Sequence, residues 1–117
     1  MTPEASSRNP IRQVRWVGKT AVVEAAGEID LNCSLDFQQA LLQLMDQRPA
    51  IVVINLAAVS YMDSSGVASL VKLLSRVRKA GVLLRLAAMS DRVRSVFEIT
   101  RLDSVFDIRN SEQEALA

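Results

Sequence analysis

The chain has 117 residues, which is enough for one compact domain and too few for two domains of ordinary size. Apolar residues make up 50% of it and charged residues 23%, which predicts a folded chain with a sizeable core. With 14 basic and 13 acidic side chains the formal charge is +1. A domain so close to neutral has no overall positive field for direct binding of nucleic acid or of an anionic membrane.

The sequence contains no histidine. This absence excludes Ser-His-Asp and Cys-His nucleophile pairs and histidine-ligated zinc, and with them most familiar hydrolases. For the chain as a whole we expect a protein that is not an enzyme and has no metal or cofactor. The single cysteine, Cys33, cannot form an intramolecular disulfide and suits a reducing compartment. The longest apolar run, residues 51–59, has about half the length of a membrane span, and the N-terminus lacks a signal-peptide apolar region. We therefore expect a cytoplasmic protein.

Two short apolar runs open the predicted domain. Residues 1–10 are rich in Thr, Ser, Asn and Pro, which predicts a flexible tail in front of one domain over residues 11–117. Runs of branched apolar residues at 11–17 and 21–26 flank Gly18-Lys19-Thr20 and predict a β-hairpin.

The spacing of apolar residues then becomes helical. Apolar positions within 37–45 recur three and four residues apart, and Pro49 marks the end of that helix. The continuous β-branched run 51–56 is typical of a central strand covered on both faces. A second helix is predicted to follow residues 63–66 and to end at Gly81. The residues that form its apolar face by their helical spacing are Val67, Leu70, Val71, Leu74 and Val77.

The remaining elements alternate in the same way. A strand is predicted over 82–88, a short helix from Asp91, an edge strand over 105–108 and a helical tail capped by Ser111. This order predicts an α/β fold, with a mixed, mainly parallel sheet of four to five strands, an antiparallel first strand and about four helices. We expect Trp16 and Tyr61 to complete the core or to cover its edges, and a partner-facing role for them stays open.

The junction between the central strand and the second helix carries the candidate chemistry. Ligands of open α/β sheets bind at such junctions, at the carboxyl ends of the strands. Here the hydroxyls of Ser64 and Ser65 follow the carboxylate of Asp63. The first-turn N–H groups and the helix dipole favour negative charge, so the following amides could hold a phosphate on Ser64. Asp and Ser are also the preferred N-cap residues of any helix, so capping alone accounts for the same pattern.

Two other chemistries fit the sequence poorly. A phosphate-binding P-loop needs a glycine-rich run that ends in Gly-Lys-Ser or Gly-Lys-Thr, and the chain has only 4 glycines and no such run. A serine nucleophile would need a base. There is no histidine to supply one, and the nearest lysine, Lys72, is predicted to face solvent.

Several segments, in their order and spacing, resemble the anti-sigma factor antagonists. These are single-domain bacterial members of the sulfate-transporter and anti-sigma-antagonist (STAS) fold. The resemblance extends over about residues 12–115, and the segments that carry it are Gly27–Asp30, Ile51–Leu56, Met62–Gly66, Arg76–Gly81 and Phe97–Thr100.

The resemblance implies a partner-switching regulator. An unphosphorylated antagonist of this kind binds an anti-sigma factor that is also a serine kinase, and so releases the sigma factor. The kinase inactivates it by phosphorylating the serine after the motif aspartate, which in this sequence is Ser64, and a serine phosphatase restores the active form. The partner-binding residues that the resemblance implies are Asp30, Asp63, Ser64, Ser65 and Gly66, together with Met89 and Ser90 of a neighbouring loop.

The physical consequence of such a modification can be stated from the residues. A phosphate adds about −1.5 to −2 charges and so reverses the sign of the net charge. We expect the fold to survive this change and the affinity for the partner to fall. Val67-Ala68 replaces the Leu-Gly common after the motif glycine in the family, and the loop 30–33 also departs from its pattern, which leaves the choice of partner open.

Two further hypotheses remain from the sequence. The chain could be a noncatalytic STAS accessory or scaffold subunit of a transporter or stress-signalling complex, in which residues 63–66 only cap a helix. It could also be a small nucleotide-binding protein, which the missing glycines argue against. The sequence does not identify the sigma factor, the kinase, the phosphatase or the signal. It also leaves the oligomeric state open.

Overall fold

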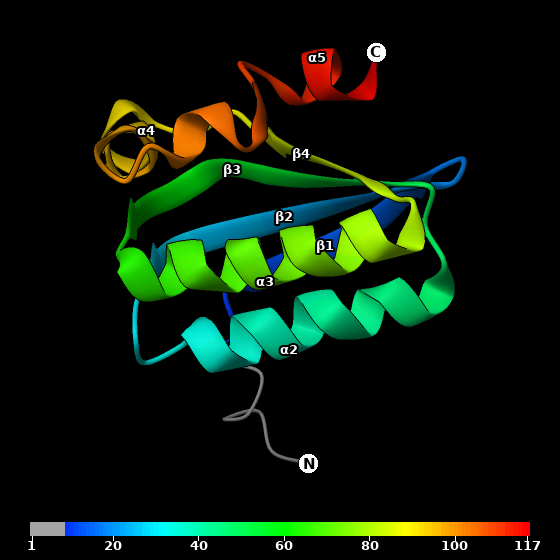
Figure 1. Ribbon diagram of the computed structural model, residues 1–117, viewed down its shortest axis with the longest axis horizontal. Helices are drawn as coiled ribbons and strands as arrows, with labels where there is room; N and C mark the ends of the chain where they lie inside the picture. Colours follow the sequence, from blue (N-terminus) through cyan, green and yellow to red (C-terminus); the bar gives the residue numbers. More distant parts are fainter. Residues whose placement is uncertain (1–8) are drawn as a thin grey trace.

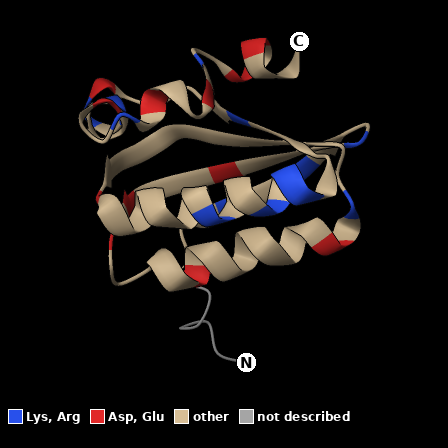
Figure 2. Ribbon diagram, in the orientation of Figure 1, with Lys and Arg blue, Asp and Glu red and all other residues tan. Residues whose placement is uncertain are grey.

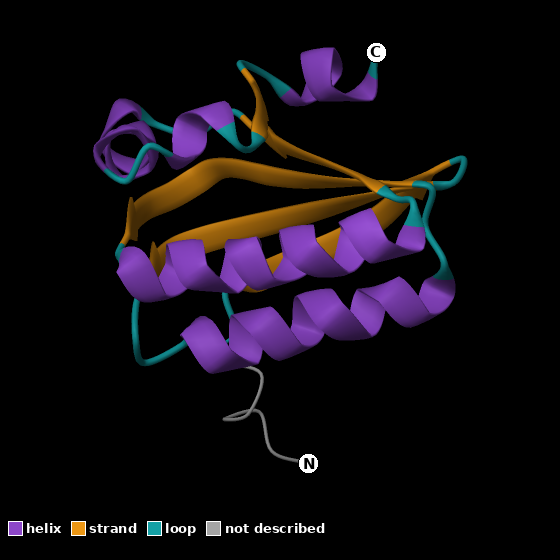
Figure 3. Ribbon diagram, viewed as in Figure 1, coloured by secondary structure: helices purple, strands orange, loops and turns teal. Residues whose placement is uncertain are grey.

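Five strands form one mixed sheet in the computed structural model of the protein, which describes residues 9–117. The strands lie side by side in chain order, and β1 is antiparallel to β2 while all later neighbours are parallel. Helices α2 and α3 cover one face, and α4 and α5 lie over the other (Figures 1 and 3). The predicted α/β class, the antiparallel first strand and the parallel remainder are confirmed.

The elements, with their bounds, are β1 (Ile11–Val17), β2 (Thr20–Ile29), α2 (Ser34–Leu44), β3 (Ile51–Met62), α3 (Ser64–Ala80), β4 (Leu83–Ala87), α4 (Asp91–Ile99), β5 (Asp107–Arg109) and α5 (Glu112–Leu116). Short 3-10 turns, Met45–Gln47 and Leu102–Ser104, follow α2 and α4. The predicted flexible tail lies outside the described residues except for Asn9 and Pro10.

Strand β3 is twice as long as the sequence pattern predicted. The prediction ended at Leu56, whereas the strand continues to Met62 and pairs in parallel with β2 over almost its whole length. Beyond Leu56 the buried residues are Val59 and Met62, while Ala57 and Ser60 are exposed. This half of the strand is covered on one face only, so it lacks the continuous apolar run that marks a strand buried on both faces.

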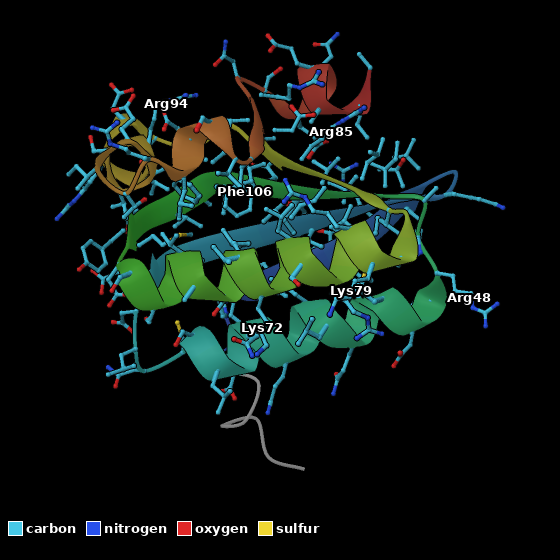
Figure 4. All side chains as sticks on the ribbon, in the orientation of Figure 1. Arg48, Lys72, Lys79, Arg85, Arg94 and Phe106 are labelled. Carbon is cyan, nitrogen blue, oxygen red and sulfur yellow. The ribbon has the colours of Figure 1, made fainter. Side chains whose placement is uncertain are left out.

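The last strand begins two residues later than predicted. Phe106 turns into the core instead of pairing, and its ring stands edge-on to Phe97 with the centroids 5.5 Å apart (Figure 4). Val105 stays 41% exposed, and pairing with β4 starts at Asp107. Of the apolar pair that suggested a strand, Phe106 therefore packs against Phe97 of α4 and Val105 stays partly exposed.

Helix α3 has the bounds that its capping residues predicted. Asp63 is its N-cap, and Gly81 ends it in the left-handed conformation with φ 71°, which glycine adopts without strain. Lys72 is exposed, as expected for the solvent face (Figure 4). Val71 departs from the predicted apolar face, because 39% of it is exposed.

The C-terminal helix α5 is fixed to the sheet by polar contacts. Glu112 forms an ion pair with Arg15 and accepts a hydrogen bond of 2.9 Å from the side-chain amide of Asn55. Arg85, on β4, donates a 2.8 Å hydrogen bond to the carbonyl of Ala115 (Figure 4). Ala115 itself is fully buried, so the sheet holds α5 both by these contacts and by packing.

Candidate functional site

The candidate site lies where β2 and β3 end together. The parallel register pairs Ile29 with Met62, and the Asp63 backbone N–H donates to the Ile29 carbonyl at 3.2 Å. The residues that follow the two strands, Asp30 and Asp63, are therefore neighbours. Figure 2 shows acidic residues in the ribbon at this end of the molecule, where α3 begins, while the basic residues of α3 lie in its middle and toward its other end. The site is an acidic corner on a nearly neutral domain.

Asp63 caps α3 through its carboxylate. Its Oδ1 accepts the backbone N–H of Ser65 at 2.9 Å and of Gly66 at 3.3 Å, and the Ser65 hydroxyl donates to the same oxygen at 2.5 Å. Burial acts to raise the pKa of Asp63, but these hydrogen bonds and one from the Leu31 amide outweigh it and leave the pKa below its ordinary value. The carboxylate is thus held ionised beside the two serines.

The two serines of the motif differ in access. Ser64 is the first residue of α3 and is exposed, whereas Ser65 is half-buried and its hydroxyl is engaged with Asp63. A modifying enzyme that approaches from solvent therefore meets the Ser64 hydroxyl first. That Ser64, rather than Ser65, accepts a phosphate stays a prediction.

The hydrogen bonds from the backbone amides to Asp63 correct one expectation. The sequence suggested that the backbone amides after Ser64 would hold a phosphate on that residue. Two of them, from Ser65 and Gly66, already donate to Asp63. A phosphate on Ser64 would therefore compete with a carboxylate for these donors, or project outward from the helix start.

Two buried residues, Gly66 and Ser69, lie beneath the site. Gly66 is buried between the ends of the two strands, so it offers no surface to a partner, contrary to its predicted role in direct binding. The buried Ser69 hydroxyl lies 3.0 Å from the Ser34 carbonyl and 3.1 Å from the Ser65 carbonyl, and so ties the start of α2 to the start of α3. These contacts fix the position of the first turn of α3, which carries Ser64.

The loop from β2 to α2 lies beside the motif. The Asp30 carboxylate accepts the Asn32 backbone N–H at 3.0 Å, which closes a local turn. Arg12, Glu28, Asp30, Asn32 and Cys33 are among the residues that line a polar depression of about 270 Å³ on this side. Burial raises the pKa of the Cys33 thiol, and the Asp30 and Asp63 carboxylates act in the same direction. The raised pKa favours the protonated thiol over the reactive thiolate.

An apolar groove of about 290 Å³ lies on the other side of Ser64. Its lining residues are Ser64, Val67, Ala68, Val71, Thr100 and Leu102. Val67 and Val71 are both predicted on the apolar face of α3, and of the two only Val67 is fully buried, at 3% exposure. The groove itself is not among the predictions. The helical spacing does contain the signal, because Ser64, Ala68 and Val71 lie at i, i+4 and i+7 and share one face of α3. The spacing does not reveal the opposite wall of the groove, which is formed by Thr100 and Leu102 directly after α4.

The two predicted binding residues of the loop after β4, Met89 and Ser90, differ in exposure. Met89 is only 8% exposed and packs in the core, so its side chain is not available for the partner contact predicted for it. The Ser90 hydroxyl accepts the Val93 backbone N–H at 3.2 Å and caps α4. The groove beside Ser64 is lined instead by Thr100 and Leu102, which follow the opposite end of that helix.

Two negative observations concern the described residues, 9–117. They include no group of three or more cysteine, aspartate or glutamate side chains arranged to hold a metal ion. None of their helices combines the length and the apolar character required to cross a membrane.

Comparison with known proteins gives a consistent result. The STAS domain family matches residues 12–115. The anti-sigma-B factor antagonist of Bacillus subtilis is 38% identical over 86 residues, which cover 74% of this chain and 78% of that protein.

Solved structures share the fold. An anti-sigma factor antagonist from Mycobacterium paratuberculosis superposes with a TM-score of 0.82 at 26% identity, over 89% of this chain and 88% of that one. The phosphorylated form of the Bacillus cell fate determinant SpoIIAA superposes with a TM-score of 0.69 at 24% identity, over 89% and 95% of the two chains.

Proposed function

Because the chain belongs to the STAS domain family, we propose that it is an anti-sigma factor antagonist that is switched by phosphorylation of Ser64. The unphosphorylated form binds an anti-sigma factor with serine kinase activity and so frees a sigma factor. Phosphorylation on Ser64 weakens that binding, and a serine phosphatase reverses it. In this scheme the protein performs no catalysis and is the substrate of its partners.

One observation carries the proposal: an exposed hydroxyl lies at a helix start, between an ordered carboxylate and an apolar groove. Ser64 lines the groove together with Val67, Ala68 and Val71, while Asp63 flanks it on the strand side. A partner that covers the groove must bring its own surface against Ser64. The acceptor is thus located inside the contact area and not at its margin, which is the placement that a binding switch requires.

The charge of a phosphate acts directly on such a contact. The modification adds about −1.5 to −2 charges at pH 7, next to Asp63 and close to Asp30. The amides that would neutralise it are already bonded to Asp63. Burial of this dianion against the apolar groove would cost a few kcal/mol, which corresponds to a loss of affinity of about a hundredfold or more.

The test uses the purified chain, ATP and the anti-sigma factors with kinase sequence features from the same genome. We expect one of these kinases to label the protein on Ser64, which mass spectrometry can locate. Calorimetric titration should then give a dissociation constant at least about a hundredfold weaker for the phosphorylated form or for Ser64→Asp than for the wild type.

Two matched variants separate the site from general effects. Ser65→Ala should still be labelled, and Ser64→Ala should bind as the wild type does but remain unlabelled. Thermal unfolding of the phosphorylated form should match that of the unmodified form within about 2 °C, because the change lies at the surface. Labelling elsewhere, or tight binding by Ser64→Asp, would refute the switch.

A further inference from the structure

Strand β1 forms one edge of the sheet and exposes apolar side chains there. No described strand pairs with its other side. Val14 is 40% exposed, Trp16 39% and Val17 48%, which is an unusual concentration for one seven-residue strand. An exposed edge of this length with apolar side chains is a template for pairing with another strand.

The backbone of β1 presents hydrogen-bonding groups outward at alternate residues. Val17 and Thr20 close a two-residue hairpin in which Gly18 has φ 60°, so these two residues bond to each other. Residues of an antiparallel pair alternate between bonding to the partner strand and pointing away from it. Arg15 and Gln13 therefore face β2, and the N–H and C=O groups of Val14 and Trp16 point away from the sheet.

These outward groups fit a second copy of the same strand. An antiparallel pair with a two-fold axis at Val14 places Val14 opposite Val14 of the second copy as a hydrogen-bonded pair. Gln13 then lies opposite Arg15 of the second copy, and Ile11 opposite Val17. Arg12 lies opposite Trp16, the pairing in which a guanidinium can stack on an indole. No like charges face one another in this register.

Pairings with the two-fold axis at Arg15 or Trp16 are less favourable than the pairing centred on Val14. An axis at Arg15 would oppose two arginines, and Arg15 turns its backbone groups toward β2. An axis at Trp16 would pair Val14 with Gly18 and so shorten the contact to the end of the hairpin. The β-bulge between Ile11 and Gln13 lies at the margin of the Val14 register, and residues 13–17 are regular.

The face that carries Val14 also has an open groove. Val14 lines it together with Ala40, Gln43, Leu44 and other residues, and its volume is about 250 Å³. Side chains directly opposite in an antiparallel pair project to the same face, so Val14 of a second copy would lie beside this groove. Two copies joined at β1 would thus extend the sheet and cover apolar surface on both.

We propose that the protein self-associates through β1, as an antiparallel, two-fold symmetric pair of edge strands centred on Val14. The two sheets join into one continuous ten-stranded sheet. This inference does not depend on Ser64 or on the proposed switch, because no residue of β1 lines the groove at Ser64.

The test is sedimentation velocity of the wild type from about 5 µM to about 500 µM, with a reversible shift from monomer to dimer expected. Trp16 is the only tryptophan, so its fluorescence maximum should move to shorter wavelength over the same range. Val14→Lys sets two lysines against each other at the axis and should raise the dimer dissociation constant at least about tenfold. Ile99→Lys, which makes the same charge change at a site that is 81% exposed on α4, should leave it unchanged.

A pair of variants at Gln13 separates association from folding. Within the monomer Gln13 lies opposite Glu24, and in the dimer it would lie opposite Arg15 of the second copy. Gln13→Lys should stabilise the monomer and weaken the dimer about threefold or more, and Gln13→Glu should do the reverse. Effects of the same sign on folding and on association would overturn the proposed register.

Three other outcomes would overturn the proposal. The wild type could stay monomeric throughout the range. A dimer could form that is insensitive to substitutions at Val14 and Gln13, which would assign it to another surface. Lastly, the wild type could stay monomeric while substitutions in β1 weaken binding to the anti-sigma factor, which would assign this edge to that partner.

Discussion

Gly66→Ala tests how closely the start of α3 packs on the ends of β2 and β3. A Cβ at position 66 would lie 2.7 Å from Cγ of Met62, 2.9 Å from Cγ2 of Ile29 and 3.0 Å from the Ile29 carbonyl oxygen. The Met62 side chain can bend away from such a contact. The Ile29 carbonyl cannot, because it accepts the Asp63 backbone N–H at 3.2 Å.

Two opposing effects decide the result. Alanine in a helix is favoured over glycine by about 1 kcal/mol, which by itself would stabilise the variant. Overpacking of a well-packed site costs about 1 to 3 kcal/mol, and contact with a fixed carbonyl puts Gly66 in the upper part of that range. The net loss of unfolding free energy is therefore about 1 to 2 kcal/mol. With an unfolding entropy of about 0.25 kcal/mol/K for a chain of this length, the melting temperature falls by about 4 to 8 °C.

Differential scanning calorimetry measures this shift directly. The matched control is Gly81→Ala, at the other end of α3, where an added Cβ meets no atom within 4 Å but the backbone has φ +71°. Its loss comes from backbone strain alone, so binding of the anti-sigma factor should be kept. In Gly66→Ala the start of the helix must move, so binding should weaken as well. A Gly66→Ala variant as stable as the wild type would refute the close-packing argument.

The remaining predictions concern charge. Carboxylates whose pKa is lowered in the folded state stabilise it above their unfolded pKa of about 4 and lose this effect as the pH falls through the folded value. They are Asp63, Asp107 and Glu112. Because there is no histidine, the unfolding free energy from urea titrations should be flat between about pH 6 and pH 8 and should fall below about pH 4.5. A step in the unfolding free energy between pH 6 and 7 would contradict this expectation. Asp63→Asn keeps the N-cap, and it should reduce the loss of unfolding free energy at acid pH. Glu112→Ala removes one of the two carboxylate partners of Arg15 and the acceptor of the Asn55 amide, and should cost about 1 kcal/mol, measured by the same titration with the exposed Gln113→Ala as control. Equal stability of the two variants would show that the side-chain contacts of Glu112 do not help to hold α5.

The elements that were predictable from sequence are those with a purely local cause. The β-branched run that starts at Ile51 marks a strand, and Asp63 and Gly81 bound α3 through capping geometry that needs no tertiary contact. Residues 57–62 were missed because their pairing with β2 is what makes them a strand. Val71 was assigned to the core for a similar reason: helical spacing identifies an apolar face but not the gap that the end of α4 leaves over it.

The place of Ser64 at the start of α3 was also predictable, but its electrostatic surroundings were not. A free helix start would offer its amides to a phosphate, and the sequence is equally consistent with that arrangement. In the structure Asp63 turns its carboxylate onto the amides of Ser65 and Gly66. A phosphate on Ser64 would then add its charge to that of a carboxylate held ionised next to it, and that carboxylate already takes the amides of Ser65 and Gly66. The N-cap contacts of Asp63 thus leave the charge of a phosphate on Ser64 at the surface, where a partner that covers the groove would contact it.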